Sequence, residues 1–174
     1  MTFANTPLQS GVDYSAVARE GAFIDSIPHN IDSLAFGTTN PDGSIYPYGE
    51  SVIYDTDHGV AYPVSGVTVA ADIAGWVAYA NGGVTDERGL QKGGLYSVVP
   101  VLNYGRIYVP VTTGEDMLVG DAVSLNLAAG AEFNTVRKLP GVPAASDIDI
   151  STIATVAEKS NGGFVLLTIN KYLK

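Results

Sequence analysis

Apolar and polar residues alternate in short runs along most of the chain, and glycine or aspartate separates one run from the next. In the stretch GRIYVPVTTGEDMLVGDAVSLN, residues 105–126, an alternating run ends at the acidic segment 114–116, and a second run follows Gly120 and Asp121. β-Branched and aromatic residues between such breaks are typical of half-buried strands. The pattern therefore predicts a strand, an acidic loop, a corner and a second strand.

Similar runs predict further strands at residues 34–36, 45–48, 51–54, 60–64, 73–80, 95–102, 152–157 and 164–170. The turns between them are rich in Gly, Pro, Asn and Asp, as in NPDG and SNGG. The last strand, FVLLTIN, is apolar on both faces, so we expect it in the centre of a sheet or under a neighbouring subunit. Gly75 interrupts the run IAGWVAYA, where we expect a neighbouring segment to approach closely.

Helical periodicity is weak, and only residues 12–20, 125–131 and 147–153 offer room for short helices. In residues 1–30 isolated apolar positions stand between Gly, Ser and Asn, which fits either an extended arm that docks on a partner or a frayed terminus with one first strand. We expect an all-β fold: a small β-barrel of Greek-key or tulip-like type over residues 31–174, an extended N-terminal arm over residues 1–30, and one or two short helices.

Composition narrows the class of protein. The chain has 174 residues, enough for one domain with a core, and it contains no Cys for disulfides or thiolate chemistry. Its net charge of −9 argues against a nucleic-acid partner. The N-terminus lacks a secretory signal, and no apolar segment approaches the roughly 20 residues of a membrane helix. We therefore expect synthesis in a cytoplasm and no membrane contact.

The charge is unevenly distributed. Residues 1–87 contain eleven Asp or Glu and one basic residue, Arg19, whereas residues 88–174 contain seven acidic and eight basic residues. The acidic half is either a surface that keeps the protein soluble or a footprint for a basic partner. The acidic pairs at 86–87 and 115–116 fall in predicted loops, and we interpret them as solvated turn charges rather than facing catalytic carboxyls.

No group of residues predicts catalysis or metal binding. His29 and His58 lack the neighbours of a Ser-His-Asp site, and Ser51 lacks the second glycine of a nucleophile elbow. The segment 55–59, DTDHG, lacks the full ligand set of a calcium loop. We find no phosphate-binding glycine motif in the sequence. We expect no catalytic residues, no cofactor and no metal ion.

Tyrosine is the commonest aromatic residue, with ten against five Phe and one Trp. A tyrosine ring that is half-buried with a wet hydroxyl suits an interface, and it equally suits the outer face of a sheet. The YPYG loop makes Tyr46 and Tyr48 candidate contact residues, and the N-terminal arm adds Phe3, Leu8 and Tyr14.

Several short segments together form a wider pattern: FG at 36–37, VIY at 52–54, IAGWV at 73–77, GRIYVPV at 105–111, VGDAV at 119–123, and the opening MTFANTPLQSG. This pattern resembles that of tailed-phage capsid cement, or head-decoration, proteins. The likeness covers about residues 1–127 and the final strand. Residues 16–21, AVAREG, stand where that family often has a small-apolar, Gly-rich segment near its N-terminus.

The resemblance implies a non-enzymatic viral structural protein, synthesised in the host bacterial cytoplasm and located in the virion on the capsid exterior. It would bind the assembled phage capsid, bridge subunits of the major capsid protein and form a homotrimer or a homodimer. The residues expected to contact the capsid are Phe3, Leu8, Tyr14, Tyr46 and Tyr48. One alternative is a carbohydrate- or receptor-binding β module of a phage fibre or adhesin. Another is an all-β hydrolase that uses His58 with Asp55 or Asp57 and a nearby Ser.

Overall fold

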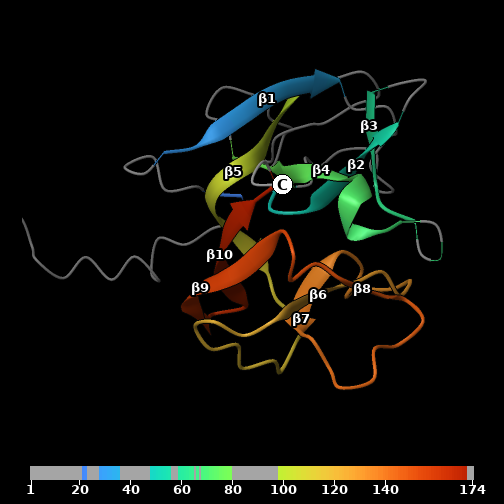
Figure 1. Cartoon of the computed structure of the whole chain (residues 1–174), viewed down its shortest axis with the longest axis vertical. Helices are drawn as coiled ribbons and strands as arrows, with labels where there is room; N and C mark the ends of the chain where they lie inside the picture. The colour runs from blue at the N-terminus through green and yellow to red at the C-terminus, as the bar shows by residue number, and fades with distance from the viewer. Residues whose placement is uncertain are drawn as a thin grey trace, which may run out of the picture.

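Ten strands in two antiparallel sheets make up most of the part of the chain that the structure, a computed structural model, describes (Figure 1). The described residues are 21–22, 28–35, 48–55, 59–64, 66, 68–79 and 98–171. The larger sheet has the order β3-β2-β4-β5-β10-β9, with β1 also on β5, and the smaller sheet has the order β7-β6-β8. The strands are β1 (Asn30–Ala35), β2 (Ser51–Asp55), β3 (Gly59–Ala61), β4 (Ile73–Val77), β5 (Val98–Pro110), β6 (Val123–Asn126), β7 (Thr135–Lys138), β8 (Asp147–Asp149), β9 (Ala154–Asn161) and β10 (Phe164–Asn170).

The larger sheet is organised around β5, its longest strand. The first half of β5 pairs antiparallel with β1 along residues 98–104, and the second half pairs with β10 along residues 104–110. β4 joins β5 at Val101 and Leu102. β5 therefore extends through the whole sheet, with β1 at one end of it and β10 at the other (Figure 1).

Gly105 allows β5 to continue where the sequence predicted two separate strands. Its φ is 128°, and a Cβ at this position would lie 2.8 Å from the Cβ of His29. Glycine accepts both this dihedral angle and this close neighbour. The chain therefore stays extended while its partner changes from β1 to β10.

Two clusters of apolar side chains fill the interior. The main cluster draws on both sheets, so it lies between them, and its members include Trp76, Ile107, Leu125, Ile150 and Leu167. The second cluster contains residues of β2, β3, β4 and β5 and lies on the other face of the larger sheet. On β5, Val101 and Leu102 belong to different clusters, because successive side chains of a strand point to opposite faces.

Two expectations about buried strands are confirmed. β10 lies between β5 and β9, and Val165, Leu166 and Leu167 are buried. Gly75 lies against β5, where a Cβ would be 2.4 Å from the carbonyl oxygen of Leu102. A larger residue at position 75 would push β4 away from β5, so this glycine permits the pairing of the two strands.

Asn134 connects the small sheet to the large one. It has a φ of 62°, and its side chain is buried against Ser51 at the start of β2. Its Oδ1 accepts hydrogen bonds from the backbone N–H (3.2 Å) and the hydroxyl (2.5 Å) of Ser51, and its Nδ2 donates to the carbonyl of Ser51 (2.9 Å). The amide thus satisfies backbone groups of β2 as a neighbouring strand would. A bridge between Val111 and Val136 joins the sheets a second time.

The all-β class is confirmed, but the strands do not close into a barrel. A single 3-10 turn, η2 (Ala70–Asp72), is the helical element of the described residues. Residues 125–131 and 147–153 offered room for short helices, but β6 ends in the first segment and β8 begins the second. β6 pairs with both β7 and β8, and this pairing outweighs the weak local preference for helix. The possible helix at 12–20 lies outside the described residues.

Replacement of Asn134 tests the connection between the sheets. Asn134→Gly keeps the positive φ and removes the amide, so we expect a loss of about 1–3 kcal/mol in the free energy of unfolding, since buried backbone groups of Ser51 lose partners. Asn134→Ala should lose about 1–2 kcal/mol more, because alanine disfavours a positive φ. Urea denaturation measures both. An Asn134→Gly variant as stable as the wild type would contradict this role.

Candidate functional site

Among the residues predicted to contact a partner, the structure describes one, Tyr48. It is half-buried, and its ring packs against that of Tyr79 with 5.1 Å between centroids and an angle of 56° between the planes. The others lie outside the described residues: Phe3, Leu8, Tyr14 and Tyr46.

The first described residues, Gly21 and Ala22, form backbone hydrogen bonds with the larger sheet beside Tyr48. Gly21 N–H donates to the carbonyl of Tyr108 (3.0 Å), and Tyr108 N–H donates to the carbonyl of Ala22 (2.8 Å). On the other side, Tyr79 N–H donates to the carbonyl of Gly21 (2.7 Å). The two residues therefore lie between β5 and the segment that follows β4.

Gly21 and Gly49 are in direct backbone contact. A Cβ on Gly21 would lie 2.9 Å from the nitrogen of Gly49, and a Cβ on Gly49 would lie 2.9 Å from the nitrogen of Gly21. Their φ angles are 71° and 74°, which also favour glycine. We call Gly21, Ala22, Tyr48 and Gly49 the glycine junction. It places residues 21 and 22 of the predicted arm next to the described part of the predicted contact loop.

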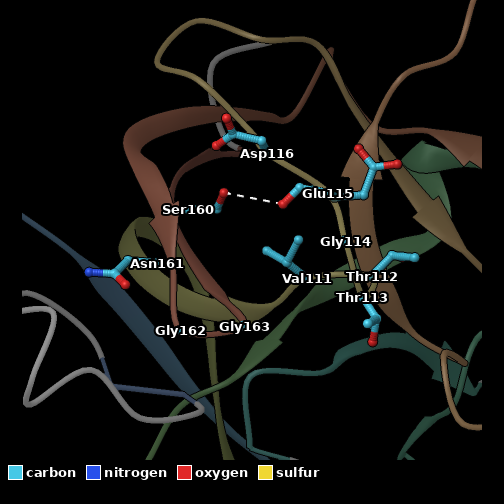
Figure 2. A pocket seen from close by; sticks show the side chains of 10 residues that line it. All are labelled: Val111, Thr112, Thr113, Gly114, Glu115, Asp116, Ser160, Asn161, Gly162 and Gly163. Atoms are coloured by element: carbon cyan, nitrogen blue, oxygen red, sulfur yellow. Dashed lines mark hydrogen bonds between the residues drawn. The ribbon is translucent and has the colours of Figure 1, made fainter.

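A shallow hollow of about 330 Å³ lies where the acidic loop meets the β9–β10 turn (Figure 2). Residues 111–116 and 160–163 line it. The side chains of Glu115 and Asp116 point in different directions (Figure 2), and Asp116 pairs with Lys159 at 3.1 Å. The two carboxylates do not face each other, so they do not form an acid–base pair.

The same loop covers the outer edge of β9. Ser160 N–H donates to the carbonyl of Met117 (3.0 Å), and Met117 N–H donates to the hydroxyl of Ser160 (3.0 Å). Gly120 N–H donates to the carbonyl of Val156 (3.1 Å). An edge strand bonded in this way is a poor template for pairing with other chains. The hollow thus lies beside a protected strand edge, and Ser160 belongs to both.

Two described side chains have shifted pKa values. The hydrogen bond from Lys138, followed by that from the backbone N–H of Leu118, lowers the pKa of Asp121 below its usual value. Burial lowers the pKa of Lys171, and Asp72 partly opposes this shift. Both shifts have structural causes, and neither side chain lines the hollow.

Of the residues considered for catalysis, the structure describes Ser51, Asp55 and His29. Ser51 is buried, and its hydroxyl donates to Asn134. His29 is exposed near Gly105, and His58 lies outside the described residues. In the described part of the chain, we find no group of three His, Cys, Asp or Glu arranged to hold a metal ion, and no helix with the length and apolar character to cross a membrane.

Comparison with known proteins gives a family match and matches to solved structures. A family model described as "Structural cement protein (E217 gp24/Pam3 gp6)" matches residues 8–170. A chain from the solved structure "The capsid of Myoviridae Phage XM1" superposes with a TM-score of 0.67 at 21% sequence identity, covering 99% of this chain and 100% of that chain. No curated protein sequence matches. The superposition shows a shared fold, and the family match covers most of the chain.

Alanine at Gly49 tests the glycine junction, with alanine at Gly114 as a matched control. Both glycines have a positive φ, 74° and 86°, but a Cβ on Gly114 would meet no atom within 4 Å. Gly114→Ala should lose about 1–2 kcal/mol of unfolding free energy from the backbone angle. Gly49→Ala should lose about 1–3 kcal/mol more from overpacking.

Amide hydrogen exchange locates the effect. In Gly49→Ala we expect faster exchange at Tyr79 and Tyr108, whose N–H groups bond to Gly21 and Ala22. Equal stability losses and equal exchange in the two variants would show that the backbone contact is unimportant.

Proposed function

The chain belongs to the bacteriophage structural cement protein family, whose model matches residues 8–170, and on this premise we propose that it binds the outer surface of the assembled capsid and bridges subunits of the major capsid protein. It is a capsid-stabilising structural protein and a component of the virion. The length of the family match is the observation that carries this proposal.

The organisation of the described residues supports a protein that works through its surface. Two of its buried polar side chains serve the fold: the Asn134 amide bonds to Ser51, and the Asn103 side chain donates to Asp32 (2.6 Å). The outer edge of β9 is covered by the acidic loop. Groups that the fold already holds in place lose little conformational entropy when a partner binds.

Bridging has a clear physical advantage on a shell that packed DNA pushes outward. A protein that touches two neighbouring subunits resists their separation, and many copies add their effects. Each contact can be as small as a standard interface, which buries about 800 Å² per partner. Several such contacts made by one oligomer still bind tightly because of avidity. We propose that the chain acts as a homotrimer, or as a homodimer, because a closed symmetric oligomer presents several identical contacts at once.

We propose that an N-terminal arm and the YPYG loop supply part of the capsid contact, through Phe3, Leu8, Tyr14, Tyr46 and Tyr48. The glycine junction supports this, because it fixes Gly21 beside Tyr48. Residues that precede Gly21 therefore start from a defined point on the body. A segment that becomes ordered on the shell would add area at that point.

Deletion of residues 1–20 tests the arm. The deletion keeps Gly21 and Ala22, and hence the hydrogen bonds of the glycine junction. We expect an unchanged circular dichroism spectrum, a similar melting temperature, and binding to heads assembled without this protein that is weaker by about tenfold or more, which corresponds to about 1.4 kcal/mol.

Co-sedimentation with such heads measures the binding. Unchanged affinity of the deleted protein would contradict the role of the arm. Absence of binding by the full chain would contradict the proposed function itself, and binding of the full chain to glycans instead would favour a carbohydrate-binding module.

A further inference from the structure

Two loops that meet beside the small sheet carry exposed apolar side chains. Leu118 and Val119, at the corner after the acidic loop, are 49% and 67% exposed, and Val142, in the loop between β7 and β8, is 87% exposed. The second loop, residues 139–146, has the sequence LPGVPAAS and contains no charged residue. We call residues 118–119 and 140–145 the apolar end. Large apolar side chains that are exposed together mark interaction sites more often than scattered ones do.

The first loop is held in one conformation by its own hydrogen bonds. The carboxylate of Asp121 accepts from Leu118 N–H (2.8 Å), and Asp121 N–H donates to the carbonyl of Leu118 (3.0 Å). Gly120 N–H is bonded to β9 as described above. Leu118 and Val119 are therefore exposed on a fixed corner.

The second loop is anchored at its base. The carboxylate of Asp147 accepts from Ala144 N–H (3.1 Å) and pairs with Arg137, and Asp147 N–H donates to the carbonyl of Ala144 (2.9 Å). Pro140 and Pro143 restrict the backbone on either side of Val142. An apolar tip held in this way loses little entropy when a partner covers it.

The two loops are neighbours. Lys138 Nζ lies 2.8 Å from a carboxylate oxygen of Asp121, and Leu139 N–H donates to the carbonyl of Ala122 (2.8 Å). Figure 1 shows both loops at the lower end of the molecule, beyond β6 and β7 and away from β1. The Lys138–Asp121 ion pair thus joins the base of one loop to the base of the other.

We propose that the apolar end is a second docking surface, separate from the glycine junction, and that it contacts the major capsid protein. This inference rests on the proposed function. The size of the surface favours the shell over a second copy of the chain as the occupant. A stable interface uses about 20–30 residues from each side, and the apolar end, residues 118–119 and 140–145, has eight. A contact of that size is too small to hold a dimer alone, but it suits one of several contacts made together on a repeating lattice.

Glutamate substitutions at Val119 and Val142 test this surface, with Val98→Glu as the matched control. Val98 is 62% exposed and begins β5 in the larger sheet, so the same change is made at similar exposure elsewhere. We expect Val142→Glu and Val119→Glu each to weaken binding to heads lacking this protein by about tenfold or more, and the double variant to weaken it further. Val98→Glu should stay within about twofold of the wild type. Val142→Ser, which adds polarity without charge, should give an intermediate loss.

Three measurements separate the outcomes: co-sedimentation with heads, light scattering for oligomeric state, and a thermal melt to confirm folding. Weaker head binding with unchanged oligomeric state supports the inference. Binding equal to that of the wild type in the double variant would overturn it while leaving the proposed function intact. A changed oligomeric state would assign the surface to contacts between copies of the chain and would also overturn it. Failure of the wild type to bind heads would contradict the proposed function, and with it this inference.

Discussion

The long strand β5 positions the rest of the structure, because the backbone N–H and C=O groups along both of its edges need partners. β1 and β10 pair with its two halves, and β4 pairs at Val101 and Leu102. Gly21 and Ala22 bond to Tyr108, and the bridge at Val111, just beyond β5, leads to the small sheet. The two sheets and the first described residues are therefore placed relative to one strand, which also contributes side chains to both apolar clusters.

Local patterns in the sequence were sufficient for the all-β class and for several strands. The final strand was predicted at 164–170 and lies there, because its apolar run is bounded by clear turn residues. Features that depend on distant segments were missed. β5 was divided in two because the approach of His29 to Gly105 is not visible in the sequence. β7 is four residues long, and its place in a sheet depends on pairing with β6 and on the Asn134 side chain that reaches Ser51.

The surface features also divide into those that the sequence shows locally and those that depend on the fold. Tyr48 was a candidate because aromatic turn residues are recognisable locally, and its place in the glycine junction joins it to segments near positions 21 and 79. The uncharged loop 139–146 is visible in the sequence. Its position beside the loop that carries Val119 is known only from the structure, where Asp121 contacts Lys138. Sequence alone therefore indicates which loops are apolar, and the fold determines which of them form one surface.

The account claims that this protein acts from the outside of the capsid by joining neighbouring subunits of the shell. A cryo-electron microscopy reconstruction of heads carrying the protein tests that claim most directly. The account predicts density for this fold on the outer surface, above junctions between major capsid subunits, with the glycine junction and the apolar end both against the shell. Density inside the shell, on the tail, or over the middle of single subunits without contact to a neighbour would contradict it.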